Sequence, residues 1–250
     1  MKSTEKTNKR RADDFRQGAR DGIPIALGYF AVSFAFGMAA ARDGIGAFYS
    51  ALTSFLCLSS AGQFAGMDVI VAGGSLIELA LTQLVINLRY LLMSFSLSAK
   101  LSPKTGIAPR LVMAHGVTDE IFAISAARQD LTPYYTWGAM SVAVPGWTAG
   151  ALTGGILGDI LPAFLLSAFG IAIYGMFLAI ILPPAREDRA VLLVVLAAGA
   201  MRALFTWTPV LDRVSGGFAI IIVTVTVSGI AAFLHPHAED ASQENGEVSS

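Results

Sequence analysis

The side chain with the clearest chemical potential in this sequence is an arginine inside an apolar segment. Arg89 lies within residues 76–99, "LIELALTQLVINLRYLLMSFSLSA". An arginine near the middle of a bilayer costs roughly 2.5–3.5 kcal/mol on insertion scales, so it is a functional candidate by default. Its guanidinium can hold a carboxylate through two parallel hydrogen bonds. The alternative is that Arg89 pairs with an acid of the chain and locks two helices together.

The segment around Arg89 carries polar residues on two sides. A helix turns by about 100° per residue, and this rotation produces two stripes: Gln83, Asn87, Tyr90 and Ser94 form one, and Glu78, Thr82, Arg89 and Ser96 form the other. Polar groups at membrane depth face protein or a water-filled cavity. We therefore expect this helix to contact protein or water on two sides.

A second polar stretch, "LSSAGQF" at residues 58–64, lies at the centre of the apolar run 47–72. Small residues with a glycine let a helix unwind or let a neighbouring helix pack closely. A broken helix presents the N-terminus of its second half, whose partial positive charge suits a carboxylate. The alternative is a packing seam in which Gln63 bonds a neighbour. The predicted substrate-binding residues are Ser59, Ser60, Gly62, Gln63, Asn87 and Arg89.

A third polar stretch, "HGVTDE", lies within the apolar segment 108–127. His115 and Asp119 are four residues apart, which puts them on one face of a continuous helix, while Glu120 points elsewhere. Because a histidine beside two acids can relay protons, we predict that His115, Asp119 and Glu120 couple transport to protons. A metal site is disfavoured, since no third ligand follows at suitable spacing. The alternative is that the acids pair with arginines for helix packing.

Composition indicates that these residues are held in a membrane. Apolar residues make up 54% of the 250-residue chain and charged residues 14%, whereas a soluble domain carries about 25% charged residues. Gly, Pro and charged residues separate apolar segments of roughly the 20 residues that cross a bilayer: 22–41, 47–72, 76–99, 108–127, 135–157, 160–182, 190–209 and 216–234. We predict an all-α integral membrane protein, a polytopic bundle of about seven to eight transmembrane helices. The prediction allows a broken helix near residues 58–64.

Charge divides the chain into three parts. Residues 1–21 form a basic N-terminal tail with seven of the 17 Lys and Arg residues. Residues 22–234 form the transmembrane transport domain, and residues 235–250 form an acidic tail that we expect to be disordered. We predict a multi-pass protein of the inner or plasma membrane with a cytoplasmic N-terminus.

One loop conflicts with this orientation. Eight full crossings would place the basic residues Lys100, Lys104 and Arg110 outside, against the preference of Lys and Arg for the cytoplasm. A re-entrant hairpin at residues 47–72 would bring the loop inside. Both arrangements stay open, with eight crossings as the first choice.

Several function classes are disfavoured by missing motifs. The sequence contains no G-x-x-x-x-G-K-[ST] phosphate loop and no G-x-S-x-G serine elbow, so neither nucleotide hydrolysis nor serine esterase chemistry is expected. Cys57 is the single cysteine and has no disulfide partner in the chain. We expect no enzyme activity, no cofactor, no metal and no nucleic-acid partner.

In the order and spacing of its motifs the chain resembles the AzlC family, the large subunits of branched-chain amino acid exporters. The resemblance covers most of the chain and is strongest from Gly22 to Ala123. It rests on these residues: Gly22, Pro24, Gly28 and Gly37 in "GIPIALGYFAVSFAFG", Gln63-Phe64, Asn87-Leu88-Arg89 with "SFSLS" behind it, and Thr118-Asp119-Glu120 with Phe122-Ala123.

The resemblance implies export of branched-chain or other hydrophobic amino acids. It also implies a small AzlD-type membrane subunit as partner, in addition to the amino acid substrate and the lipid bilayer. A secondary, proton-linked carrier is the simplest reading. A passive channel or pore for a small solute, or a structural or assembly subunit, remains an alternative.

Overall fold

In a computed structural model the protein is built of helices, with no strand among the described residues, which are 2–158, 178, 181–183, 185–208, 211 and 214–234. The helices are α1 (Lys2–Arg42), α2 (Ala47–Leu56), α3 (Ser60–Val71), α4 (Leu76–Lys100), α5 (Ile107–His115), α6 (Asp119–Ala126), α7 (Pro133–Leu157), α9 (Arg189–Trp207) and α10 (Gly216–Leu234). They fall into two compact units, residues 1–174 and 175–250. The predicted all-α class is confirmed for the described residues.

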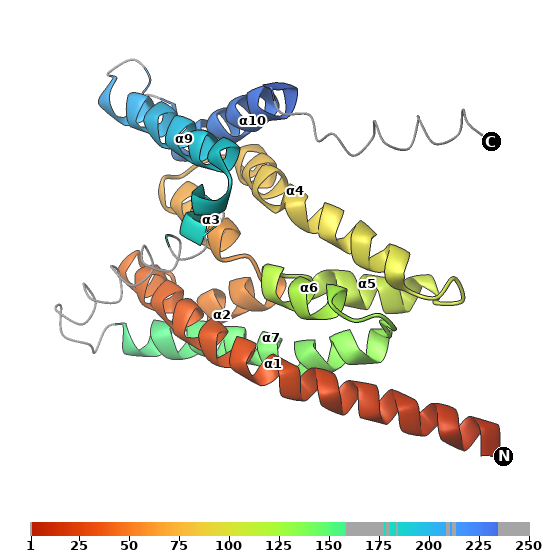
Figure 1. The fold of residues 1–250 in the computed structure, drawn as a ribbon. Coiled ribbons are helices and arrows are strands. Elements are labelled where there is room, and N and C mark those ends of the chain that lie inside the picture. The colour runs from red at the N-terminus through yellow and green to blue at the C-terminus, as the bar shows by residue number, and fades with distance from the viewer. Residues whose placement is uncertain are drawn as a thin grey trace, which may run out of the picture. The chain divides into compact units, whose positions relative to one another are not determined.

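Close packing of α1 against α7 forms the frame of the first unit (Figure 1). Glycines make the close approach possible. A Cβ added to Gly138 would lie 2.0 Å from the Phe15 carbonyl oxygen, and one added to Gly154 would lie 2.0 Å from that of Phe34. Small residues that let backbones touch are the usual device for packing helices in a bilayer. The predicted basic tail, residues 1–21, is helical from residue 2 and continues into the apolar part of α1.

The apolar run 47–72 is two helices, α2 and α3, separated by a break at Cys57–Ser59. The Ser59 hydroxyl caps α3 by accepting from the Gly62 N–H at 3.1 Å. The start of α2 and the body of α3 both lie near the end of α1: a Cβ on Gly155, at the end of α7, would lie 2.7 Å from the Ala47 Cα, and Met67 of α3 packs against residues 36 and 40 of α1. The chain therefore turns back at the break, and we call α2–α3 the first hairpin.

The expected single span 108–127 is wrong, because this segment is also two helices, α5 and α6. The break falls at Gly116–Thr118, where Thr118 caps α6 by accepting from the Ile121 N–H at 3.4 Å. Both outer ends lie beside the end of α4: Arg110 donates to the Ser98 carbonyl at 2.7 Å, and the Lys100 ammonium donates to the Ala126 carbonyl. We call α5–α6 the second hairpin.

Ion pairs fix the direction of α4 relative to α1. Arg10 near the start of α1 lies 3.4 Å from Asp130, and Arg128 lies 3.8 Å from Asp14. Lys100, at the end of α4, donates to the Arg128 carbonyl at 3.3 Å. The start of α1, the end of α4 and the loop 127–132 therefore share one face of the first unit, which we call the N-terminal face.

It follows that the two hairpins enter the first unit from opposite sides. The second hairpin starts and ends at the N-terminal face, and the first starts and ends at the other (Figure 1). The basic loop with Lys100, Lys104 and Arg110 thus lies on the same side as the basic start of α1. This arrangement agrees with the re-entrant alternative for residues 47–72, in which the basic loop and the basic N-terminus share one side.

The predicted number of spans is not established. Four described helices are long and apolar enough to cross a bilayer: residues 8–42, 76–100, 189–207 and 216–234. In the second unit α9 and α10 pack through a cluster of apolar side chains, among them Phe205 and Val223. Most of the predicted span 160–182, and the predicted disordered tail 235–250, lie outside the described residues. About seven to eight spans therefore remains a prediction.

Candidate functional site

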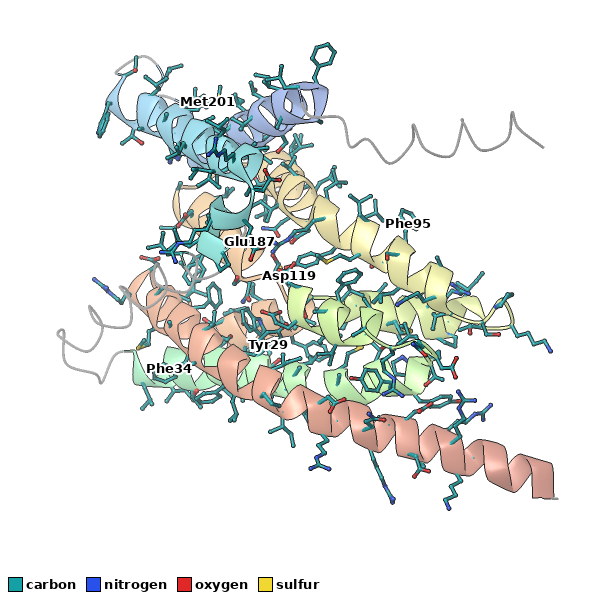
Figure 2. The ribbon with its side chains drawn as sticks, in the orientation of Figure 1. Tyr29, Phe34, Phe95, Asp119, Glu187 and Met201 are labelled. Atoms are coloured by element: carbon teal, nitrogen blue, oxygen red, sulfur yellow. The ribbon has the colours of Figure 1, made fainter. Side chains whose placement is uncertain are left out.

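The tips of the two hairpins meet beside the middle of α4. Arg89 of α4 places its Nη2 atom 2.9 Å from the Asp119 Oδ2 atom, in the first turn of α6. The same nitrogen donates to the Tyr90 hydroxyl at 3.0 Å. The Ser59 hydroxyl, at the first tip, lies near the Tyr90 hydroxyl. We call Ser59, Asn87, Arg89, Tyr90 and Asp119 the tip site; Figure 2 shows Asp119 at the start of α6.

The ion pair at the tip site is accessible. The side chains of Arg89 and Asp119 are 47% and 38% exposed, whereas Ser59 and Thr118 at the two tips are buried. An ion pair that is open to a solute can exchange partners at lower cost than a sealed one, because water replaces the lost contacts. The structure thus contains the pairing that the sequence analysis gave as the alternative for Arg89, an arginine paired with an acid of the chain.

Gln63 fastens the first hairpin to the bundle. It is 2% exposed, its Nε2 atom donates to the Ser54 hydroxyl at 2.6 Å, and its Oε1 atom accepts from the Trp147 indole N–H at 2.7 Å. Both ends of the amide are therefore occupied by the protein. This geometry matches the packing alternative for Gln63 and gives the amide a positioning role at the tip.

The neighbouring polar residues Gln83 and Asn87 of α4 hold the tip, and the Asn87 side chain keeps a buried acceptor without a partner. Gln83 donates through Nε2 to the Gly62 carbonyl at 2.7 Å. Asn87 donates through Nδ2 to the Gln83 Oε1 atom at 3.0 Å. The Asn87 Oδ1 atom is buried and has no hydrogen-bond partner among the described residues. Because an unpaired buried acceptor is costly, this oxygen is a candidate to accept from a ligand. Ser60 begins α3 and is partly exposed.

Two aromatic residues, Tyr29 and Trp147, lie beside the tip site, although sequence reasoning did not select them. The Tyr29 hydroxyl of α1 donates to the Glu120 carboxylate at 2.6 Å and lies 2.5 Å from the Thr118 hydroxyl. Its ring packs edge-on against Trp147, with centroids 5.1 Å apart. A buried tyrosine or tryptophan needs a polar partner. Their presence inside apolar segments was therefore the sequence signal that could have identified them. Glu120 thus has a donor independent of Arg89.

His115 does not share a continuous helix with the two acids, contrary to expectation. It is the last residue of α5, its ring centroid lies 5.8 Å from that of Phe55, and the break at Gly116–Thr118 separates it from Asp119. The prediction that His115 and Asp119 share one helical face is therefore wrong, because no continuous helix connects them. Among the described residues no group of three or more His, Cys, Asp or Glu side chains could hold a metal ion.

An apolar cavity of about 290 Å³ adjoins the first tip. This volume is close to the lower limit of small-ligand pockets, about 300 Å³. Polar groups of Cys57, Gly62 and Gln83 line one part of the cavity. Its apolar walls come from four helices and include Phe36, Leu56, Met67, Ile70 and Leu79. The cavity is suited to a compact aliphatic group.

Known proteins place the sequence in one family. The family described as "AzlC protein" matches residues 24–161. The inner membrane protein YgaZ of Escherichia coli K12 is 27% identical over 197 residues, which cover 75% of this chain and 80% of the relative. An uncharacterized membrane protein of Archaeoglobus fulgidus is 31% identical over 172 residues, 68% of this chain and 75% of the relative. No solved structure matches the chain.

Proposed function

Because the chain belongs to the AzlC family of membrane proteins, we propose that it is the large subunit of a transporter that exports branched-chain or other hydrophobic amino acids. The observation that carries the proposal is an accessible arginine–carboxylate pair where the tips of two opposed hairpins meet. Half-helices that end near the middle of a bundle are a common way for transporters to hold a small solute.

The carboxylate and the side chain of an aliphatic amino acid each have a partner near the tips. Arg89 supplies the cation for the substrate carboxylate, and its planar fork favours a carboxylate geometry. Ser59, Ser60 and the backbone around Gly62 contribute polar groups of the first tip. Gln63 keeps this tip in place, and the adjoining cavity of about 290 Å³ receives the aliphatic side chain.

Further features of the proposal concern transport itself. The protein works as a secondary carrier linked to protons, with a small AzlD-type subunit, and without enzyme activity or a cofactor of its own. Its N-terminal face lies in the cytoplasm, which agrees with the basic residues gathered there. A passive pore or an assembly subunit is the alternative. The polar groups gathered at the tips favour the carrier, since a pore needs a continuous polar path.

The proposal is tested by measuring export of a labelled amino-acid panel from cells with and without this chain, each with and without the AzlD-type subunit. Export of leucine, isoleucine or valine should require both chains, and deletion should raise sensitivity to toxic leucine or valine analogues. Unchanged export and unchanged intracellular amino-acid pools in the deletion strain would contradict the proposal. Loss of leakage for all small solutes alike would instead indicate a pore.

A further inference from the structure

Asp119 lies where a zwitterionic ligand bound to Arg89 would need a partner for its ammonium group. A bound amino acid presents a carboxylate and an ammonium. Arg89 can bind only the carboxylate. The groups near Gly62 that could accept from the ammonium are engaged, because the Gly62 carbonyl accepts from Gln83 and both ends of the Gln63 amide are bonded. The carboxylate that pairs with Arg89 is that of Asp119, whose side chain is 38% exposed.

We propose that the substrate inserts into the Arg89–Asp119 ion pair, so that its carboxylate binds Arg89 and its ammonium binds Asp119. This assignment rests on the proposed function and adds the ammonium partner to it. One ion pair of the empty protein is exchanged for two ion pairs in the complex. A zwitterion adds no net charge, so every charged group keeps an opposite partner, as desolvated charges require.

The groups around Asp119 fit this exchange. Arg89 and Tyr90 approach it from α4, and Glu120 is its neighbour on α6. Glu120 has its own donor in Tyr29 of α1, so it does not need Arg89. His115 ends α5 and packs on Phe55.

Insertion also explains how proton movement would drive export. An ionised Asp119 accepts from the substrate ammonium, and a protonated Asp119 does not. Substrate and proton therefore compete for the same carboxylate. A proton taken up by Asp119 from the outside releases the amino acid there, and loss of that proton to the inside restores the binding form. Affinity for leucine consequently falls as the pH falls through the titration of Asp119.

The test compares three ligands in membrane vesicles that contain the full chain and its small subunit. Leucine carries both charges, leucinamide lacks the carboxylate, and 4-methylpentanoate lacks the ammonium. Each competes against labelled leucine. The near-isosteric variant Asp119→Asn is compared with Asp130→Asn, which removes an acid from the exposed N-terminal face. Immunoblots give the amount of each variant in the membrane.

Wild-type protein and Asp130→Asn should bind leucine about tenfold or more better than either single-charge ligand. Asp119→Asn should weaken leucine binding by about tenfold or more. It should strengthen binding of 4-methylpentanoate, because the Asp119 carboxylate no longer competes with the ligand carboxylate for Arg89. The pH dependence of leucine binding should disappear in Asp119→Asn.

Three results would overturn the insertion. Asp119→Asn could weaken leucine and 4-methylpentanoate equally, as expected of a purely structural bridge. It could leave leucine binding unchanged, or it could keep the wild-type pH dependence. In each of these cases the wild type still binds leucine, so the proposed function stands. A wild type that binds no aliphatic amino acid overturns both.

Discussion

Replacing Gln63 with alanine separates the packing role of its amide from a role in binding substrate. The change removes the hydrogen bond to Ser54 and leaves the buried Trp147 indole N–H without its acceptor. A hydrogen bond contributes a net of about 0.5–1.5 kcal/mol, and a stranded buried donor costs about 1–3 kcal/mol. The expected loss of stability is therefore roughly 2–4 kcal/mol.

The assay is thermal unfolding of the purified chain in detergent, followed by tryptophan fluorescence. At about 2–4 °C per kcal/mol for a chain of this size, the apparent melting temperature should fall by roughly 4–16 °C. Trp147→Phe keeps most of the ring and strands only the Gln63 Oε1 atom, so it should cause a smaller fall.

Two outcomes would refute this reasoning about Gln63. If both variants melt like the wild type, the two hydrogen bonds do not hold the first hairpin. If Gln63→Ala melts normally but binds leucine more weakly, the amide contacts the substrate directly, as the sequence first suggested. A fall in melting temperature with normal affinity after refolding into lipid supports the positioning role.

Three further predictions follow from the fold and the tip site. Arg89→Lys keeps the charge but loses the planar fork of the guanidinium. The apparent affinity for leucine should therefore fall at least about tenfold, or 1.4 kcal/mol, while the amount of protein in the membrane stays normal. Normal transport by this variant would show that the substrate carboxylate is held elsewhere. Gly154→Ala should melt at a much lower temperature than Gly28→Ala. A Cβ at residue 154 would lie 2.0 Å from a carbonyl oxygen of α1, whereas nothing lies within 4 Å of a Cβ at residue 28. Equal melting temperatures of the two variants would contradict the close packing of α1 and α7. Cysteines introduced at Gly74 and Ser102, in a chain without its native thiol, should react with impermeant reagents from opposite sides; labelling from one side would exclude the opposed hairpins.

The sequence predicted part of this site because some breaks in a helix carry local signals. Small residues around Gly62 indicated the first break, and the structure places it slightly earlier, at Cys57–Ser59. The second break was missed although its signal was present. Thr118 followed by two acids is a typical helix start, and Gly116 precedes it. Reading 108–127 as one helix then placed His115 wrongly.

Long-range partners could not be predicted, because periodicity within one helix does not specify its neighbour. Gln63 and Trp147 are 84 residues apart, and no local pattern connects them. Glycines allow helices to pack closely in general, but they do not specify that α1 and α7 pack on each other. The Arg89–Asp119 pair was one of several pairings that the sequence allowed.

The most direct measurement is efflux of labelled leucine from proteoliposomes that contain the chain and its small subunit, with an imposed proton gradient. An acidic exterior should accelerate leucine efflux in a saturable way, and Arg89→Ala should abolish the acceleration at equal protein content. Labelled lysine should stay inside, since its charged side chain does not suit an apolar cavity. Leucine efflux that equals the efflux from protein-free liposomes, with both subunits present and folded, would contradict a carrier for aliphatic amino acids.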